Sequence, residues 1–287
     1  MLAGCVCPDR SRYTLGVFVG GVFLVAALGR LSLAEEQAPL RVCVLQDNLP
    51  YSSRLGESGF DLDTARAVAA GLQRPLVPVW IENSRYIDEL GESDLPLRQL
   101  SRNECDAIFS VPGPEAVKDA PKLALGRPYY GAAFELLGRD GGVPSRLAAL
   151  KEKPVAVQAQ TIANFVLHAQ KVPVRTFFSV EAALAGVVQG EAEAALVWGP
   201  TAGWYLRTHP DMPLVFVPGY KPPAVVCWNE HVATRKSDAA LREAIDTVLA
   251  QLSADGTLRT LMDRYGLPFH PPFDSTYSLA EMYKIQQ

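Results

Sequence analysis

The stretch from Leu40 to Leu72 constrains the fold more than any other part of the sequence. It opens with a short run of apolar and β-forming residues, 40–45, which predicts a buried strand. A polar loop follows, and Asp61 is placed to cap the first turn of a helix. Apolar residues then recur at helical spacing, and residues 74–80 predict the next strand. Strand, loop, helix and strand predict an α/β fold, in which loops at the carboxyl ends of strands form binding crevices.

Composition argues against several classes of function. The 287 residues are enough for two lobes that each have a sizeable core. Charged residues make up 20% of the chain, the formal net charge is −4 and the two signs are interspersed, so we expect no nucleic-acid partner. The histidines are scattered and the cysteine spacing does not suit zinc, so we predict no metal site and no cofactor.

The N-terminal segment, residues 1–34, predicts a cleaved secretory signal peptide. Arg10 and Arg12 precede an apolar run over residues 15–28, and a small-x-small pattern ends at Ala34. The alternative is an uncleaved membrane anchor, but the run is shorter than the ~20 apolar residues that span a bilayer. We therefore expect a secreted, periplasmic protein.

The rest of the chain alternates between strand-like and helical segments, which predicts βαβ units and a mainly parallel sheet. Extended segments near 127–137 and 223–228 are expected to cross between two lobes. The predicted division is residues 40–131 and 224–267 for lobe 1, 132–223 for lobe 2 and 268–287 for a C-terminal tail packed on the outside. Thr161 and Ser179 are natural caps for two helices of lobe 2.

Three cysteines remain after removal of the signal peptide, in a compartment that permits disulfides. Cys43 lies in the first predicted strand, and Cys105 precedes another strand expected in the same sheet. Neighbouring strands can bring two cysteines within bridging distance, so we predict a Cys43–Cys105 disulfide and a free Cys227. The alternative is three buried thiols.

Residues 40 to about 267 resemble family 3 of the bacterial extracellular solute-binding proteins, which bind polar amino acids for ABC importers. The patterns that carry the resemblance are Gly59-Phe60-Asp61-Leu62-Asp63, Glu104-Cys105-Asp106-Ala107-Ile108 with Arg127-Pro128-Tyr129-Tyr130, Ser179-Val180-Glu181-Ala182-Ala183-Leu184, and Leu241-Arg242 through Asp255-Gly256-Thr257. The resemblance implies a periplasmic binding protein-like fold: two α/β lobes, two crossing strands and a ligand cleft between the lobes.

A narrower resemblance is to the accessory branch found with quinoprotein (PQQ-dependent) methanol and alcohol dehydrogenases. It rests on Asp47-Asn48-Leu49-Pro50-Tyr51-Ser52, Val111-Pro112-Gly113 and Val197-Trp198-Gly199-Pro200-Thr201-Ala202-Gly203. The loop from Ser84 to Asp94 does not match that branch. The branch implies a dehydrogenase or its cytochrome as partner, whereas the wider family implies an importer permease. With either partner, we expect the protein to be a monomer and to bind a small molecule.

Three positions depart from the amino-acid binders that the chain resembles. The arginine that clamps the ligand carboxylate corresponds to Lys118, which lacks the planar fork. The acidic residue that takes the ammonium corresponds to Trp198, which cannot accept a hydrogen bond, and the stacking aromatic corresponds to Asn48. The alternatives are that Lys118 is a solvated surface residue and that Trp198 fills the core of a closed cleft.

The cleft expected from this comparison has a mixed lining, and its predicted ligand-binding residues are Asn48, Tyr51, Phe60, Ser110, Lys118, Gln158, Thr161 and Trp198. The helix start at Thr161 favours an anion, and Trp198 offers a flat apolar face. The hypothesis is therefore a small, non-zwitterionic ligand, anionic and with an apolar body. Tyr129 and Tyr130 are expected to serve packing.

Two further classes of function stay open. Periplasmic cyclohexadienyl dehydratases resemble these binders and use carboxylates of the cleft for acid–base catalysis. Glu115 and Asp47 lie near the predicted cleft, but neither has an evident second carboxylate beside it. The other class is an adaptor that keeps the fold without a ligand. We predict a non-catalytic binding protein without catalytic residues.

Overall fold

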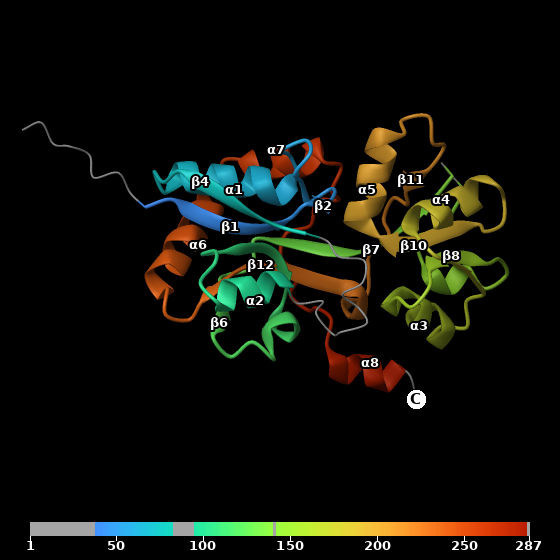
Figure 1. The fold of residues 1–287 in the computed structure, drawn as a ribbon. Coiled ribbons are helices and arrows are strands. Elements are labelled where there is room, and N and C mark those ends of the chain that lie inside the picture. Colours follow the sequence, from blue (N-terminus) through green and yellow to red (C-terminus); the bar gives the residue numbers. More distant parts are fainter. Residues whose placement is uncertain (1–37, 83–94, 140–141, 286–287) are drawn as a thin grey trace, which may run out of the picture. The chain divides into compact units, whose positions relative to one another are not determined.

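A computed structural model of the chain describes residues 38–82, 95–139 and 142–285 (Figure 1). The predicted signal peptide over 1–34 and the entire loop from Ser84 to Asp94 lie outside these residues. No helix within them combines the length and the apolar character needed to cross a bilayer.

The described chain alternates strands and helices in the order expected of an α/β protein. The strands are β1 (Leu40–Leu45), β2 (Asp47–Asn48), β3 (Ser52–Ser53), β4 (Leu76–Ile81), β5 (Ile108–Pro112), β6 (Leu123–Leu125), β7 (Tyr130–Gly138), β8 (Val155–Gln158), β9 (Val174–Phe177), β10 (Ala194–Trp198), β11 (Val215–Phe216) and β12 (Cys227–Arg235). The helices are α1 (Phe60–Gly71), α2 (Leu95–Ser101), α3 (Ile162–Ala169), α4 (Val180–Val188), α5 (Gly199–Thr208), α6 (Ala239–Ala254), α7 (Thr257–Arg264) and α8 (Leu279–Ile285), with short 3-10 turns η2 (Pro114–Val117), η3 (Leu147–Ala149) and η4 (Ala224–Val226).

Two long antiparallel strands, β7 and β12, join the lobes. Cys227 of β12 pairs with Ala133 of β7, and the two strands then diverge: β12 continues to β5 and β6, whereas β7 continues to β10 and β11. The resulting sheet has the order β5-β12-β7-β10-β8-β9. The expectation of a mainly parallel sheet is corrected, because β7 pairs antiparallel with both β12 and β10; parallel pairing holds for β1–β4, β8–β9 and β8–β10.

Residues 40–81 fold as strand, loop, helix and strand. β1 pairs in parallel with β4, and Pro78 is tolerated in β4 because that strand has β1 as its partner in the described structure and lies at an edge. The predicted role of Asp61 as N-cap is wrong: α1 begins at Phe60, and its N-cap is Gly59. Gly59 has a φ of 133°, and a Cβ there would lie 2.3 Å from the Tyr51 carbonyl oxygen, so the turn requires glycine.

Buried side chains gather in separate cores on the two sides of the crossing strands. On the β1 side, Phe60, Tyr130 and Met262 belong to one cluster. On the β10 side, Leu136 and Leu196 belong to another. The periplasmic binding protein-like architecture predicted from the sequence is therefore present, with α1, α6 and α7 on one side and α3, α4 and α5 on the other (Figure 1).

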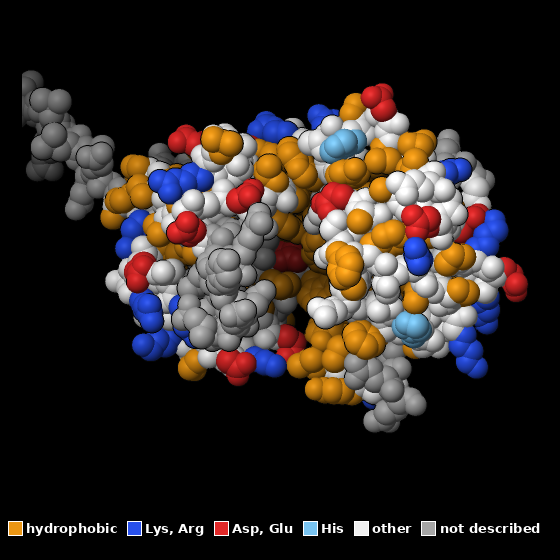
Figure 2. All heavy atoms as spheres, turned by 45° about the vertical axis from the view of Figure 1, so that its right-hand side comes forward, with side chains coloured by type: hydrophobic (Ala, Val, Ile, Leu, Met, Phe, Trp, Pro, Cys, Tyr) orange, Lys and Arg blue, Asp and Glu red, His pale blue; other side chains and the backbone are white. Residues whose placement is uncertain are grey.

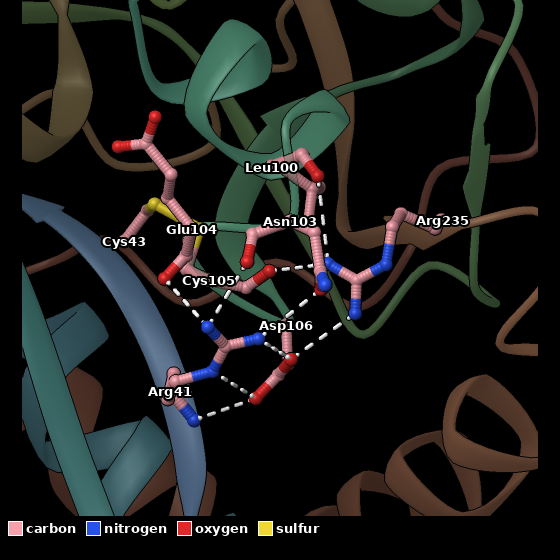
Figure 3. Close-up of a disulfide and its surroundings, with 8 residues drawn as sticks. All are labelled: Arg41, Cys43, Leu100, Asn103, Glu104, Cys105, Asp106 and Arg235. Atoms are coloured by element: carbon pink, nitrogen blue, oxygen red, sulfur yellow. Dashed lines mark hydrogen bonds and ion pairs between the residues drawn. A yellow bond between two sulfur atoms is a disulfide. The ribbon is translucent and has the colours of Figure 1, made fainter.

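The Cys43–Cys105 disulfide is confirmed (Figure 3). It joins β1 to the segment before β5, with a Cα–Cα distance of 5.6 Å, and the neighbouring Val42 and Ala107 form a parallel bridge. Cys227 is a free, buried thiol, also as predicted. Burial raises the pKa of Cys227 to about 12, so this thiol stays protonated and unreactive at neutral pH.

A partly buried ion-pair network lies beside the disulfide (Figure 3). Asp106 is 7% exposed and accepts hydrogen bonds from Arg41 at 2.7 Å and from Arg235 at 3.1 Å. Burial alone would raise the pKa of Asp106, but the bonds from Arg41 and Arg235 outweigh it and the pKa is lowered. The network and the disulfide together fix β1 and the start of β5 relative to each other.

The helix starts predicted in lobe 2 are found where expected, but only one of them uses its side chain. Ser179 precedes α4 and accepts a hydrogen bond from the Ala182 N–H at 3.2 Å. Thr161 holds the N-cap position of α3, yet its hydroxyl donates to the Gln158 carbonyl at 2.8 Å instead of accepting from the helix.

The described part of the C-terminal tail packs along the crossing strands. Phe273 and Asn229 exchange two hydrogen bonds, at 2.7 and 2.9 Å, and His270 bonds to Glu135 of β7 at 2.7 Å. The Tyr277 N–H donates to the Cys227 carbonyl, and its ring stacks on Trp228 with 5.2 Å between centroids. The tail therefore contacts the strands that join the lobes.

Candidate functional site

A cavity of about 440 Å³ lies between the lobes, where β7 and β12 cross. Figure 2 shows the hollow on the surface, with hydrophobic side chains on its walls and acidic atoms recessed within it. The lining residues are Cys43, Val44, Leu45, Asn48, Tyr51, Ser52, Asp61, Pro96, Ile108, Phe109, Ser110, Pro112, Phe134, Trp198, Trp228 and Glu230.

Lobe 1 contributes a group of hydroxyls and one carboxylate. Ser110, in β5, has a φ of 49°, and its hydroxyl lies 2.5 Å from the Asp61 carboxylate, to which it donates. The same hydroxyl lies 2.8 Å from the Tyr130 phenol and 3.2 Å from the Tyr129 phenol. Asp61 reaches this group because it stands in the first turn of α1, directly after the tight turn at Gly59.

A second carboxylate lies on β12. Glu230 pairs through its backbone with Tyr130, is 2% exposed and lines the cavity. One of its carboxylate oxygens, Oε2, is buried and has no hydrogen-bond partner among the described residues. Burying a carboxylate oxygen without a hydrogen bond costs free energy. This atom therefore marks a place where a hydrogen-bond donor is missing among the described residues.

The environment of the two carboxylates favours their neutral forms. Burial raises the pKa of Asp61 to about 7, although the Ser110 hydrogen bond acts against the shift. Burial, together with repulsion from Asp61, raises the pKa of Glu230 to about 8. Burial and the same carboxylates raise the pKa of Tyr51, Tyr129 and Tyr130 well above the usual value, so these phenols stay protonated.

Lobe 2 and the crossing strands supply an aromatic wall. Trp198 lies 5.5 Å from Phe134 and 5.5 Å from Trp228, measured between ring centroids, with edge-to-face geometry in both pairs. The indole N–H of Trp198 donates to the Tyr51 phenol oxygen at 3.0 Å. A lobe 2 residue thus bonds directly to a lobe 1 residue across the cavity.

The structure brings together half of the residues predicted to bind ligand. Asn48, Tyr51, Ser110 and Trp198 all line the cavity. Phe60 is fully buried behind it and packs edge-to-face on Tyr130, with 5.2 Å between centroids.

The other three predicted residues are not among those that line the cavity. Lys118 lines a separate hollow, between α2 and η2, together with Glu115, one of the two carboxylates considered for catalysis. Gln158 ends β8, and Thr161 bonds to its carbonyl. The structure therefore gives no support to the anion expected from Lys118 and Thr161.

Sequence reasoning missed both carboxylates of the cavity and Trp228. The position of Asp61 before an apolar helix is typical of a helix cap, which conceals its place in the cavity. The sequence does hold a signal for Glu230: Asn229, Glu230 and His231 form a polar run directly after the crossing strand predicted at 223–228. Two of these side chains are accounted for, because Asn229 bonds to the tail and His231 to the Gly126 carbonyl, which leaves Glu230 for the cavity.

Within the described ranges, no three His, Cys, Asp or Glu side chains are grouped so that they could hold a metal ion. The carboxylates of the cavity are accompanied by aromatic and aliphatic side chains, and no Lys, Arg or His is among the described residues that line it. The site therefore offers acidic groups, hydroxyls and aromatic faces.

A comparison with models of protein families identifies one family. Residues 40–268 match the model of the bacterial extracellular solute-binding proteins, family 3. A comparison with curated proteins gave no significant match. The unliganded open L-cystine solute receptor of Neisseria gonorrhoeae is similar in structure, at 19% identity and a TM-score of 0.67, over 80% of this chain and 93% of the receptor.

Two other solved structures bear on the alternatives. MxaJ from Methlophaga aminisulfidivorans MPT is 21% identical with a TM-score of 0.59, over 80% of this chain and 99% of MxaJ. The ancestral amino acid-binding protein AncCDT-1, a precursor of cyclohexadienyl dehydratase, is 24% identical with a TM-score of 0.51, over 79% of this chain and 95% of AncCDT-1. At these identities the likeness concerns the fold.

Proposed function

Because the chain belongs to family 3 of the bacterial extracellular solute-binding proteins, we propose that it is a non-catalytic periplasmic receptor for a small, non-zwitterionic molecule held between its lobes. The observation that carries the proposal is the lining of the cavity: two carboxylates and an aromatic wall, without a basic side chain among the described lining residues. An α-amino acid would bring a carboxylate that no Arg or Lys of this lining neutralises.

Calorimetric titration tests the negative part of this proposal. Each of the polar amino acids is titrated into protein that has been unfolded, dialysed and refolded, so that no retained molecule blocks the cavity. We expect no binding in the micromolar range. Micromolar binding of any amino acid would contradict the proposal and favour an ordinary amino-acid receptor.

For the partner, we propose the quinoprotein dehydrogenase-associated branch over an importer permease. The sequence patterns around residues 47–52 and 197–203 support it, and the likeness in fold to MxaJ agrees with it. The predicted periplasmic location, with the signal peptide over residues 1–34, is part of the same proposal. Capture from a periplasmic extract, followed by mass spectrometry, should recover a dehydrogenase or its cytochrome; recovery of a permease complex instead would reverse the preference.

One observation favours a second candidate, acid–base catalysis. Asp61 and Glu230 line one cavity and repel each other, and their raised pKa values of about 7 and about 8 suit proton transfer near neutral pH. Prephenate and arogenate are the substrates to try, given the fold shared with a dehydratase precursor. Turnover that disappears in Glu230→Gln would establish catalysis in place of simple binding.

A further inference from the structure

The unpartnered oxygen of Glu230 is the starting point for assigning a ligand class. Glu230 is only 2% exposed, and it lines the same cavity as Asp61. Two carboxylates without a basic partner in the described lining leave uncompensated negative charge in a site of low polarity. Either protons or a bound cation must supply the missing positive charge.

The walls of the cavity suit an organic cation better than a metal ion. Aliphatic side chains in the lining are Val44, Leu45 and Ile108, and the aromatic ones are Tyr51, Phe109, Phe134, Trp198 and Trp228. Aromatic faces attract ammonium groups through their quadrupoles, and apolar walls accommodate the carbon body of a ligand. A divalent metal ion needs six or more oxygen ligands or several His and Cys side chains, and the described residues form no such group.

Neighbouring hydroxyls are already engaged in the lobe 1 network. The Ser110 hydroxyl donates to Asp61, and the phenols of Tyr129 and Tyr130 lie within hydrogen-bonding distance of Ser110. The Tyr51 phenol accepts from Trp198. None of these bonds reaches Oε2 of Glu230, which has no partner among the described residues and is therefore available to accept a hydrogen bond from a ligand.

We infer that the cavity binds a small organic cation, an amine or a quaternary ammonium with an apolar body, whose charge lies near Asp61 and Glu230 and whose body lies against Trp198 and Trp228. This inference rests on the proposed binding function and names its ligand class. It replaces the anion expected from the sequence, which depended on Lys118 and Thr161. The volume of about 440 Å³ is in the range of small-molecule sites.

Three probes with the same aromatic ring and different charge test the inference. Benzylamine, benzyl alcohol and benzoate are each titrated by calorimetry into refolded, ligand-free protein at neutral pH. We expect benzylamine to bind at least ten-fold more tightly than benzyl alcohol and benzoate not to bind measurably. Equal affinity of benzylamine and benzyl alcohol, tighter binding of benzoate, or no binding of benzylamine at millimolar concentration would each overturn the inference.

Two variants locate the binding within the cavity. Glu230→Gln removes the carboxylate charge but keeps the shape of the side chain, and it should weaken benzylamine binding at least ten-fold. Asp61→Asn makes the same kind of change at the other carboxylate and should also weaken binding. Glu243→Gln, on the exposed face of α6, makes the same chemical change outside the cavity and should leave binding unchanged. Unchanged affinity in folded Glu230→Gln and Asp61→Asn, verified by circular dichroism, would overturn the assignment of the charge to these carboxylates.

Failure of this inference can be separated from failure of the proposed function. Tight binding of benzyl alcohol or benzoate would contradict the cationic ligand class but would still support a binding protein. If the cavity binds none of the probes and the protein is purified from the periplasm without a retained small molecule, both the cationic ligand class and the binding function are contradicted. Native mass spectrometry of the gently purified protein measures independently whether a small molecule is retained.

Discussion

The indole N–H of Trp198 donates to the phenol oxygen of Tyr51 at 3.0 Å, and this bond joins lobe 2 to lobe 1 across the cavity. Family members of this fold bind their ligands by closing two lobes around them. A direct bond between the lobes favours the closed arrangement in the absence of ligand. Trp198 therefore connects the two lobes in addition to lining the cavity.

Removal of this bond should shift the protein toward an open arrangement. Tyr51→Phe deletes the acceptor and keeps the ring; a net contribution of about 1 kcal/mol per hydrogen bond predicts a roughly five-fold fall in the ratio of closed to open molecules. Spin labels on Ala70→Cys in α1 and Ala169→Cys in α3, both at exposed positions, report the distance between lobes. The buried Cys227 should not react with the label.

The chain offers a matched control for that experiment. Tyr220→Phe removes another phenol hydroxyl of lobe 2, one that is buried without a partner among the described residues. The distance distribution should not change in this variant. If Tyr51→Phe and Tyr220→Phe give the same distribution as the parent, the bond does not influence closure.

The disulfide should make a large contribution to stability. Cys43 and Cys105 are 62 residues apart in sequence, and closing a loop of that length stabilises by about 4 kcal/mol in the chain-entropy model. Cys43→Ser together with Cys105→Ser should therefore lower the free energy of unfolding, measured in urea, by about that amount. Cys227→Ser should cost much less, because it breaks no cross-link. Equal losses in the two variants would contradict this account of the bridge.

The carboxylates of the cavity should make stability depend on pH. Because the folded-state pKa values of Asp61 and Glu230, about 7 and about 8, exceed the unfolded values, the folded protein holds protons that the unfolded chain has released. This stabilisation is complete below about pH 4 and is lost as the pH rises through 7 and 8. The groups that face them, Tyr51, Tyr129 and Tyr130, do not titrate in this range.

Urea unfolding at pH 5 and pH 8.5 measures this dependence. The ligand-free protein should lose several kcal/mol between these values, and Glu230→Gln should remove at least half of the loss. Glu243→Gln should retain the full loss. A protein that gains stability over this interval, with Glu230→Gln behaving in the same way, would show that Glu230 is ionised in the folded state at low pH.

The C-terminal tail should stabilise the aromatic wall. Tyr277 stacks on Trp228, a lining residue, and its N–H bonds to the neighbouring strand. Tyr277→Ala should lower the free energy of unfolding by roughly 2 kcal/mol and weaken benzylamine binding, because the wall loses its outer support. Tyr283→Ala, at a position that is 59% exposed in α8, is the control and should do neither. If both variants behave alike, the stacking of Tyr277 has no special role.

Local rules predicted most of the strands and helices and the disulfide, and the family resemblance predicted the two-lobe architecture. Alternating apolar segments and helix-capping residues are determined by neighbours in the sequence, and the Cys43–Cys105 pair followed from placing two strands side by side. The antiparallel pairing of β7 was missed, because periodicity identifies a strand but not the direction of its partner. Likewise, Asp61 looked like a cap, since the requirement for glycine at position 59 arises from the close approach of Tyr51.

The site was harder to predict than the fold. Lys118 was placed in the cleft by comparison with the family and Thr161 because it begins a helix, and neither residue is among those that line the cavity. Glu230 is in the cavity because β12 pairs with β7 in one particular register, which places its side chain beside the lobe 1 network. Such long-range pairing leaves no periodic trace in the sequence.

The most direct test of the central claim is native mass spectrometry of the protein purified gently from the periplasm, repeated after mild denaturation. The account predicts a retained small molecule that is lost on unfolding, carries an amine or quaternary ammonium, and is absent from the Glu230→Gln variant. A bare protein, with no mass difference between the native and the denatured state in either form, would contradict it.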